Sequence, residues 1–138
     1  EIFKLINKHP AMYVSTNDGG QPRVRGILMF HADEEGIVFH TGTTKDLYRQ
    51  LMLDGRAEVC FNCGKYQIRV EGTFELDERE EIRQEIVNHP SRAFLKPWRK
   101  EFGEENFWDF LKIFRMKHGK AHVWTFEDNF APKKYIEL

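Results

Sequence analysis

Cysteine is scarce in this sequence. Only Cys60 and Cys63 occur among the 138 residues, in the segment CFNC. A secreted disulfide scaffold needs more cysteines, and a tetrahedral zinc site needs two further ligands. The six histidines are scattered, and only His118 and His122 have the spacing of a ligand pair. We therefore expect no metal site, two reduced structural thiols and a reducing, cytoplasmic compartment.

Long apolar runs and a strong charge imbalance are also lacking. No apolar stretch approaches the roughly 20 residues of a membrane helix, and no signal-peptide pattern opens the chain. The formal net charge is −1, so bulk electrostatics favours neither a nucleic acid nor an anionic membrane as partner. No catalytic triad or paired-carboxylate site stands out, and no catalytic residue is assigned. Any chemistry is therefore expected to belong to a cofactor.

Alternating apolar residues are abundant, and 41% of the chain is hydrophobic. Length and composition fit a single domain over residues 1–138. The short turns between the alternating segments indicate antiparallel pairing. Six twisted antiparallel strands favour a small closed or split β-barrel, because closure removes exposed edges. The period-two pattern predicts strands at residues 11–17, 21–31, 36–41, 56–62, 66–76 and 119–127.

Three or four helices are expected around this mainly β fold. Helical spacing predicts helices at residues 1–9, 44–53 and 78–89, and Asp77 is expected to cap the third. A fourth helix is predicted over 107–114, where four apolar residues follow the spacing i, i+3, i+4, i+7. These are Phe107, Phe110, Leu111 and Phe114.

The segment HTGTTKDLYRQL (residues 40–51) lies between a predicted strand and a predicted helix. A helix N-terminus has unsatisfied N–H groups and a partial positive charge. Gly42 permits close backbone approach, the threonines supply hydroxyls, and Lys45 supplies a charge, which together suit a phosphate. The alternative is that Thr43 or Thr44 simply caps the helix.

Two further polar features lie on predicted strands. Arg23 and Arg25 are two residues apart and share a face with the apolar Ile27 and Met29. A charged pair that opens an apolar face suits an aromatic anion, although a solvated barrel exterior would also explain it. Gln67 lies on the polar face of its strand, where an amide can donate to and accept from a heteroaromatic ring.

Residues 91–118 are rich in aromatic and basic side chains. Such a mixture can bind single-stranded nucleic acid by stacking. The aromatic residues largely follow a helical stripe, however, and acidic residues dilute the charge. Packing in the core or at an interface is therefore the preferred interpretation, and no nucleic-acid partner is expected.

The order of these motifs is more specific than any one of them. The segments QPRVRG, GIVFHTGTTKDLYRQL, RAEVCF and YQIRVEG together resemble the pyridoxamine 5'-phosphate oxidase-like family of FMN-binding split barrels. The resemblance covers mainly residues 10–76. It implies an FMN cofactor bound at the subunit interface of a homodimer, with a small-molecule substrate.

The resemblance also implies roles for individual positions. Arg25, helped by Arg23, would reach the flavin phosphate, with Thr43, Thr44 and Lys45 around it. Backbone near Gly26 would line the flavin ring, and Gln67 would contact the flavin from the other subunit. The positions implied for cofactor binding are Arg23, Arg25, Gly26, Ile27, His40, Thr41, Thr43, Thr44, Lys45 and Gln67.

The sequence departs from the true oxidase in two places. The loop before Lys45 is one residue shorter, and the C-terminal segment DNFAPKKYIEL lacks the arginine and histidine motif that binds the substrate in the oxidase. We therefore expect an FMN-dependent oxidoreductase that is not a pyridoxamine phosphate oxidase. The alternatives are a non-catalytic flavin carrier or sensor, the same barrel holding a deazaflavin or haem, and a nucleic-acid module.

Overall fold

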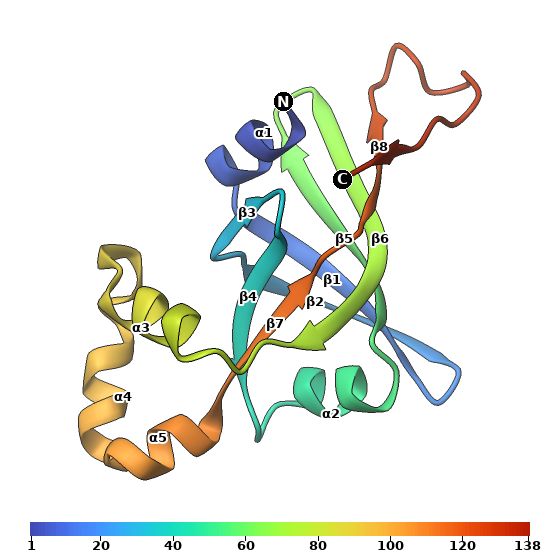
Figure 1. Cartoon of the computed structure of the whole chain (residues 1–138). Helices are drawn as coiled ribbons and strands as arrows, with labels where there is room; N and C mark the ends of the chain where they lie inside the picture. Colours follow the sequence, from blue (N-terminus) through green and yellow to red (C-terminus); the bar gives the residue numbers. More distant parts are fainter.

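The computed structural model describes residues 1–138 and contains nine strands in one bent antiparallel sheet (Figure 1). The sheet order is β2-β1-β5-β6-β7-β4-β3, with β8 paired to β6 and β9 to β8. The ends of this order, β2 and β3, form no ladder with each other, so the barrel is split. The strands are β1 (Ala11–Asp18), β2 (Gln21–Leu28), β3 (His31–Asp33), β4 (Gly36–Gly42), β5 (Arg56–Cys63), β6 (Tyr66–Leu76), β7 (Leu111–Met116), β8 (Lys120–Trp124) and β9 (Ile136–Glu137).

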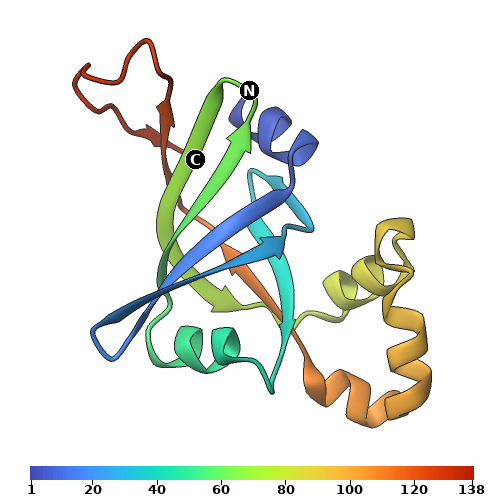
Figure 2. The same ribbon diagram turned by 180° about the vertical axis from the view of Figure 1, so that it is seen from behind.

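Five α-helices and one 3₁₀ turn accompany the sheet. None of the five is long and apolar enough to span a membrane. Figure 2 shows that α3, α4 and α5 lie on one side of the barrel, away from the C-terminal loop. The helices are α1 (Ile2–Lys8), α2 (Asp46–Leu53), α3 (Glu80–Asn88), α4 (Leu95–Phe102) and α5 (Glu104–Phe110), with the turn η1 at Pro90–Arg92.

Strand β6 connects the two halves of the barrel. Its 11 residues pair first with β5 and β8 and then, from Phe74 to Leu76, with β7. Gly72 lies where the partners change, and a Cβ there would approach Met116 Sδ to 2.8 Å. Glycine therefore permits the close crossing of β6 over the side chain from β7.

Two apolar clusters form the core. The larger one fills the barrel with the inward residues of β1, β5 and β6, such as Val14, Phe61 and Val70. The smaller one joins α3 and α5 to the outer face of β4 and β7. Phe39 belongs to the first cluster and Val38 to the second, so β4 is buried on both faces. The three helices after β6 therefore pack on the barrel as a second layer.

The mainly β split barrel expected from the sequence is confirmed, and all six predicted strands are present. Three short strands, β3, β7 and β9, were not predicted. The helix predicted over 107–114 is wrong beyond Phe110, because Leu111–Met116 forms strand β7. This strand pairs with both β4 and β6 and is buried on both faces. Its sequence, LKIFRM, does not alternate between apolar and polar residues, because Arg115 is buried through its ion pair with Asp77, so no strand pattern competes with the helical spacing.

The two cysteines are free thiols, as the sequence analysis expected. Both lie on β5, and their spacing of three residues directs them to opposite faces of the strand. Cys63 is buried in the barrel core, and Cys60 is half-buried. Burial raises the pKa of both thiols, so little reactive thiolate forms near neutral pH.

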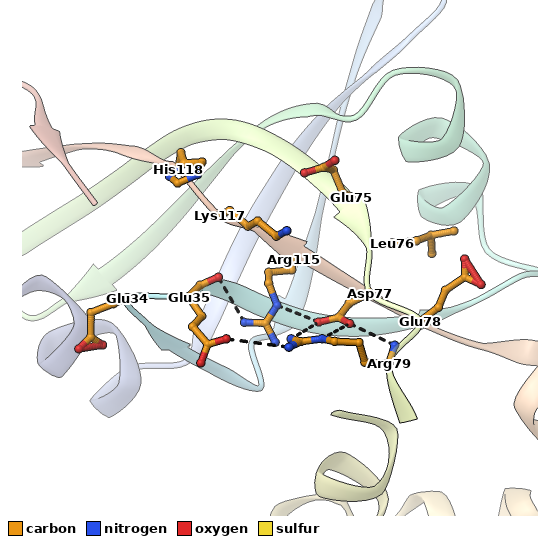
Figure 3. Close-up of a pocket in the computed structure, with 10 residues that line it drawn as sticks. All are labelled: Glu34, Glu35, Glu75, Leu76, Asp77, Glu78, Arg79, Arg115, Lys117 and His118. Carbon is orange, nitrogen blue, oxygen red and sulfur yellow. Dashed lines mark hydrogen bonds and ion pairs between the residues drawn. The ribbon is translucent and has the colours of Figure 1, made fainter. Parts of the chain in front are cut away.

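A buried ion pair fixes the junction between β6, α3 and β7 (Figure 3). The Asp77 carboxylate accepts from Arg115 Nε at 2.8 Å and from Arg79 Nε and Nη2, each at 2.9 Å. Asp77 was expected to cap α3, but the N-cap residue is Arg79, without a side-chain cap bond. The hydrogen bond from the Arg79 side chain, with that from Arg115, holds the pKa of Asp77 far below its usual range.

Substituting Asp77→Asn tests this junction. The variant leaves the buried Arg115 guanidinium without its counter-charge, which costs roughly 3–5 kcal/mol when one member of a buried pair is removed. We expect a loss of this size in the free energy of unfolding, measured by urea denaturation at pH 7. The control Glu78→Ala removes an exposed neighbouring carboxylate and should change stability by less than about 0.5 kcal/mol.

The same comparison has an expected pH dependence. Because the folded-state pKa of Asp77 lies below the unfolded value, its contribution is fully present above about pH 4 and is lost as the pH falls through the folded pKa. The difference in stability between wild type and Asp77→Asn should therefore narrow in acid. A difference that stays constant down to about pH 2 would show that Asp77 does not supply the stabilising charge.

Candidate functional site

Helix α2 begins without a side-chain cap. Lys45 is its N-cap residue with extended backbone angles, and neither Thr43 nor Thr44 bonds to the first turn. The backbone N–H groups of residues 46–48 find no acceptor within the chain. The alternative that Thr43 or Thr44 simply caps the helix is therefore wrong. Free N–H groups at a helix start, with exposed hydroxyls and an exposed lysine, favour an anion.

The glycine of this loop has a different role from the one expected. A Cβ at Gly42 would collide with the ring of Phe110, the last residue of α5. Phe110 O also accepts a hydrogen bond from Thr43 N at 3.0 Å. Gly42 therefore makes room for the helical layer rather than for a ligand, and one loop amide is already satisfied.

Arg25 is a half-buried cation without an ion pair. Its Nη1 donates to Thr16 Oγ1 at 2.7 Å and to Val14 O at 3.3 Å, and its Nη2 donates to Gln50 Oε1 at 2.5 Å. All three acceptors are neutral. Burial is the main cause that lowers the pKa of Arg25, although the group stays charged at pH 7. The positive charge is thus held in place from the inner side of β2 and is not neutralised.

The structure brings Arg23 and Arg25 to the first turn of α2. They share a surface pocket of about 450 Å³ with Asp46 from that turn. Arg49 from α2 also lines this pocket. The sequence analysis missed it, although a signal was present: Arg49 follows Lys45 by four residues, so both lie on one face of the helix. Asp18 accepts hydrogen bonds from Arg23 and Arg49 at 3.2–3.4 Å. Three arginines thus outweigh two aspartates at this site.

Strand β2 offers an open backbone beyond these arginines. It lies at the edge of the sheet order, so one side of its backbone is not used in a ladder. Gly26 is exposed, and a Cβ there would meet nothing closer than Tyr13 at 3.8 Å. Ile27 on the inner face is half-buried. A planar ring can therefore approach the backbone of residues 26–28 without collision.

His40 and Thr41 lie at the end of β4, the strand that leads into the anion loop. Thr41 is half-buried and pairs with Lys112 of β7. His40 faces the helical layer, and its Nε2 accepts from Arg92 Nε at 2.8 Å. Burial, followed by the charge of Arg92, lowers the pKa of His40 to about 4. The imidazole is therefore neutral at pH 7.

Arg92 is a site residue that the sequence analysis did not single out. It is buried in η1 and donates to Leu28 O at 3.1 Å as well as to His40. It therefore joins the ends of β2 and β4 to the helical layer. Its partners are 52 and 64 residues away in the chain, so no local sequence pattern indicates the contact.

Gln67 is separate from the other site residues. It lies on the outer face of β6, where its Nε2 donates to Asn62 Oδ1 at 3.3 Å and its Oε1 accepts from Arg69 Nε at 2.6 Å. Two strands, β1 and β5, lie between β6 and β2, a separation of roughly 14 Å. One chain therefore does not bring Gln67 to Arg25. A second pocket of about 630 Å³ lies nearby, lined by Arg69, Trp124 and the C-terminal loop.

These features fit a phosphorylated aromatic cofactor in two parts. The donor set at α2 combines a cation, free amides and hydroxyls, which is the chemistry of a phosphate site. The β2 edge beside it accepts a flat ring. The pocket near Gln67 combines a cation and an indole, with Arg69 stacked 6.0 Å from the Trp124 ring centroid. Each part alone is incomplete.

Comparison with known sequences gives a family match over most of the chain. A sequence profile of the family described as pyridoxamine 5'-phosphate oxidase matches residues 1–106. A pyridoxine/pyridoxamine 5'-phosphate oxidase from Rhizobium meliloti is 27% identical over 96 residues, which are 67% of this chain and 47% of that protein. The chain spans about half the length of the curated relatives that it matches first.

Solved structures with the same fold are also found. A NimC/NimA family protein from Clostridium acetobutylicum has a TM-score of 0.75 at 19% identity, covering 99% of this chain and 91% of its own. A haem binding protein from Mycobacterium smegmatis has a TM-score of 0.71 at 12% identity, covering 97% and 55%. A pyridoxamine 5'-phosphate oxidase-related, FMN binding protein from Nostoc punctiforme has a TM-score of 0.57 at 12% identity, covering 99% and 94%.

These structural likenesses support the split-barrel fold, while the profile match covers more than half of the sequence. The resemblance carried by QPRVRG, GTTKDL and YQIRVEG is therefore confirmed at the level of the family. The chain belongs to the pyridoxamine 5'-phosphate oxidase family.

Proposed function

We propose that this protein binds FMN, with the phosphate at the start of α2 and the ring along β2. The observation that carries the proposal is Arg25, a half-buried cation without an ion pair, which shares a pocket with the uncapped first turn of α2. Family membership and the FMN-binding relative from Nostoc punctiforme support the choice of FMN among phosphate esters.

In this proposal the residues of the anion loop bind the phosphate. Lys45 and Arg25 supply charge, Thr43 and Thr44 donate hydroxyl hydrogen bonds, and Arg23 strengthens the local field. The amides of residues 46–48 complete the donor set. Bound FMN would supply hydride or electron transfer between a reduced nicotinamide or other small-molecule donor and an acceptor.

The ring would lie against the backbone of Gly26 and Ile27 at the open edge of β2. His40 and Thr41 would lie beside it at the end of β4, with His40 on the side of the helical layer. No side chain here is an evident acid or base for the reaction, so the protein contributes position, charge and exclusion of water. In this proposal the protein is an FMN-dependent oxidoreductase.

A homodimer completes this site. Gln67 is roughly 14 Å from β2 within one chain, so a second copy is needed to bring it to the cofactor. An exposed apolar patch on the outer face of β1 and β2 suits such an interface, because patches of this kind favour protein contacts. Tyr13, Val24 and Leu28 form it, with exposed fractions of 52%, 68% and 47%.

The matched segment covers 47% of the oxidase from Rhizobium meliloti, so the substrate of that relative is not carried over to this chain. The two free thiols suit a reducing, cytoplasmic setting. The alternative is a flavin carrier or sensor without turnover. Bound flavin that reduced nicotinamides do not reduce would favour this alternative.

Haem binding is a second candidate, favoured by the fold likeness to the haem binding protein from Mycobacterium smegmatis. The absorbance spectrum of the protein purified from its native host separates the two candidates. A flavin spectrum supports the proposal, while a haem or deazaflavin spectrum replaces it.

FMN should also stabilise the protein. At a free concentration of about 100 times its Kd, a ligand that binds only the folded state adds about 2.7 kcal/mol. Thermal unfolding with excess FMN should shift upward by several degrees relative to the protein alone. A colourless protein whose melting temperature does not change with FMN would contradict the proposal.

Lys45→Ala tests the phosphate site directly. Loss of a charged hydrogen bond costs roughly 1.5–3 kcal/mol, so the Kd for FMN, measured by fluorescence quenching, should rise roughly ten- to hundredfold. Lys4→Ala, an exposed lysine on α1, serves as the matched control and should leave the Kd unchanged. Equal affinity in the two variants would return residues 43–46 to a simple helix start.

Substitution of the apolar patch tests the dimer. The double variant Val24→Asp and Leu28→Asp places charges in the proposed interface and should yield monomers in sedimentation velocity. Leu53→Asp is the control, because Leu53 is exposed on α2 outside this patch. Dimers that persist in the double variant would place the interface elsewhere.

A further inference from the structure

Arg92 is a buried charge with no opposite charge beside it. Its side chain is only 2% exposed. The other two buried charged side chains, Asp77 and Arg115, pair with each other at 2.8 Å. A buried charge without a counter-charge is costly, so its neutral partners must hold it for a reason beyond packing.

The hydrogen bonds of Arg92 go to three different elements. Nη1 donates to Ser91 Oγ at 3.1 Å and Nη2 to Leu28 O at 3.1 Å, while Nε donates to His40 Nε2 at 2.8 Å. Phe30 and Phe94 flank the guanidinium, with ring centroids 5.4 and 5.9 Å from Cζ. The group is therefore fixed from several sides, and its charge is directed at the ends of β2 and β4.

The contact with His40 determines where the imidazole proton lies. A guanidinium has only donors and does not lose its proton in proteins. His40 Nε2 must therefore be the acceptor, which requires a neutral ring whose proton is on Nδ1. The lowered pKa of His40, about 4, agrees with this state at neutral pH.

The proton on His40 Nδ1 is available to a ligand. Nδ1 has no partner within the chain, and no buried side-chain nitrogen or oxygen lacks one, so Nδ1 lies at the accessible surface. The residues that face the ring are uncharged apart from Arg92. Ile113 lies opposite His40 on β7. The Phe94 ring is tilted relative to the His40 ring, with the two centroids 6.2 Å apart.

We propose that Arg92 is a positioning residue of the cofactor site, which holds His40 as the neutral Nδ1–H tautomer and so makes it a hydrogen-bond donor to an acceptor atom on the flavin ring. Arg92 also bonds the carbonyl of Leu28, in the backbone stretch where the ring would lie. The inference rests on the proposed FMN site, but the tautomer itself is a property of the free protein.

The first experiment uses the full chain without cofactor. Long-range ¹H–¹⁵N NMR of ¹⁵N-histidine-labelled protein between pH 4.5 and 8 reports the tautomer of His40 directly. We expect the Nδ1–H form from pH 8 down to about 5.5, protonation only toward the acid end of the range, and no titration near 6.5. Observation of the Nε2–H form, or titration near the ordinary value of about 6.5, would overturn the proposal without any variant.

Variants then assign the effect to Arg92. Arg92→Met should raise the pKa of His40 only part of the way toward about 6.5, because burial, the larger cause, remains, and it should allow the Nε2–H form. Arg92→Lys, which keeps a charged donor, should retain the Nδ1–H form. Arg99→Met, in α4 and paired with Glu104, is the control and should change neither. Circular dichroism verifies that each variant is folded, and an unchanged His40 in folded Arg92→Met would overturn the assignment.

Titration with FMN tests the contact with the ligand. The His40 Nδ1 signal should shift on saturation, while the signals of His118, distant from the site, should not. FMN binding that leaves His40 unperturbed would overturn this inference and leave the proposed function intact. Absence of FMN binding would overturn the proposed function. The tautomer of His40 in the free protein would still show whether Arg92 holds the proton on Nδ1.

Discussion

The shape of this molecule depends on one strand that changes its partners. Strand β6 pairs with β5 and β8 along its first part and with β7 at its end. Where the partners change, Gly72 lies against Met116, and a Cβ there would come within 2.8 Å of Met116 Sδ and displace that side chain. Residues 77–110 connect β6 to β7, and these two strands pair with each other. The barrel therefore fixes the positions of both ends of this connecting segment.

Contacts at both ends of residues 77–110 explain why the helices of this segment lie beside the candidate site. At its start, Asp77 N donates to Ile113 O, and the Asp77 carboxylate binds Arg115. At its end, Phe110 packs on Gly42 and accepts from Thr43 N. The helical layer is thus bonded to residues 42–43 of the loop that we propose as the phosphate site. Within the aromatic stretch, Phe107 and Phe114 are buried in the core, whereas Phe94, Trp98 and Phe102 are 41–49% exposed.

Features that depend on residues close in sequence could be predicted, and features that depend on contacts between distant residues could not. The longer strands with one buried face alternate in sequence and were predicted, whereas β3 and β9, with three and two residues, are too short to show a pattern. Strand β7 was assigned to a helix because it is buried on both faces, and its pairing with β4 and β6 outweighs the helical spacing. Arg25 and the start of α2, which share a pocket, could be inferred as a candidate site from short motifs. Arg92 could not, since its contacts with His40 and Leu28 are set only by the tertiary fold.

The placement of charge along β2 has a consequence for the ligand. Arg25 lies near one end of the open edge, and Arg92 bonds Leu28 O three residues further along, a distance of roughly 10 Å. Both cations donate their hydrogen bonds to neutral groups, and in the pocket of Arg25 three arginines exceed two aspartates. A net positive charge therefore remains there, although the whole chain has a net charge of −1. A ligand that matches this edge has a full negative charge at one end and a ring with electron-rich acceptors at the other. A free phosphate satisfies only the first requirement and an uncharged aromatic ring only the second, which is why a phosphorylated heteroaromatic cofactor suits this edge better than either.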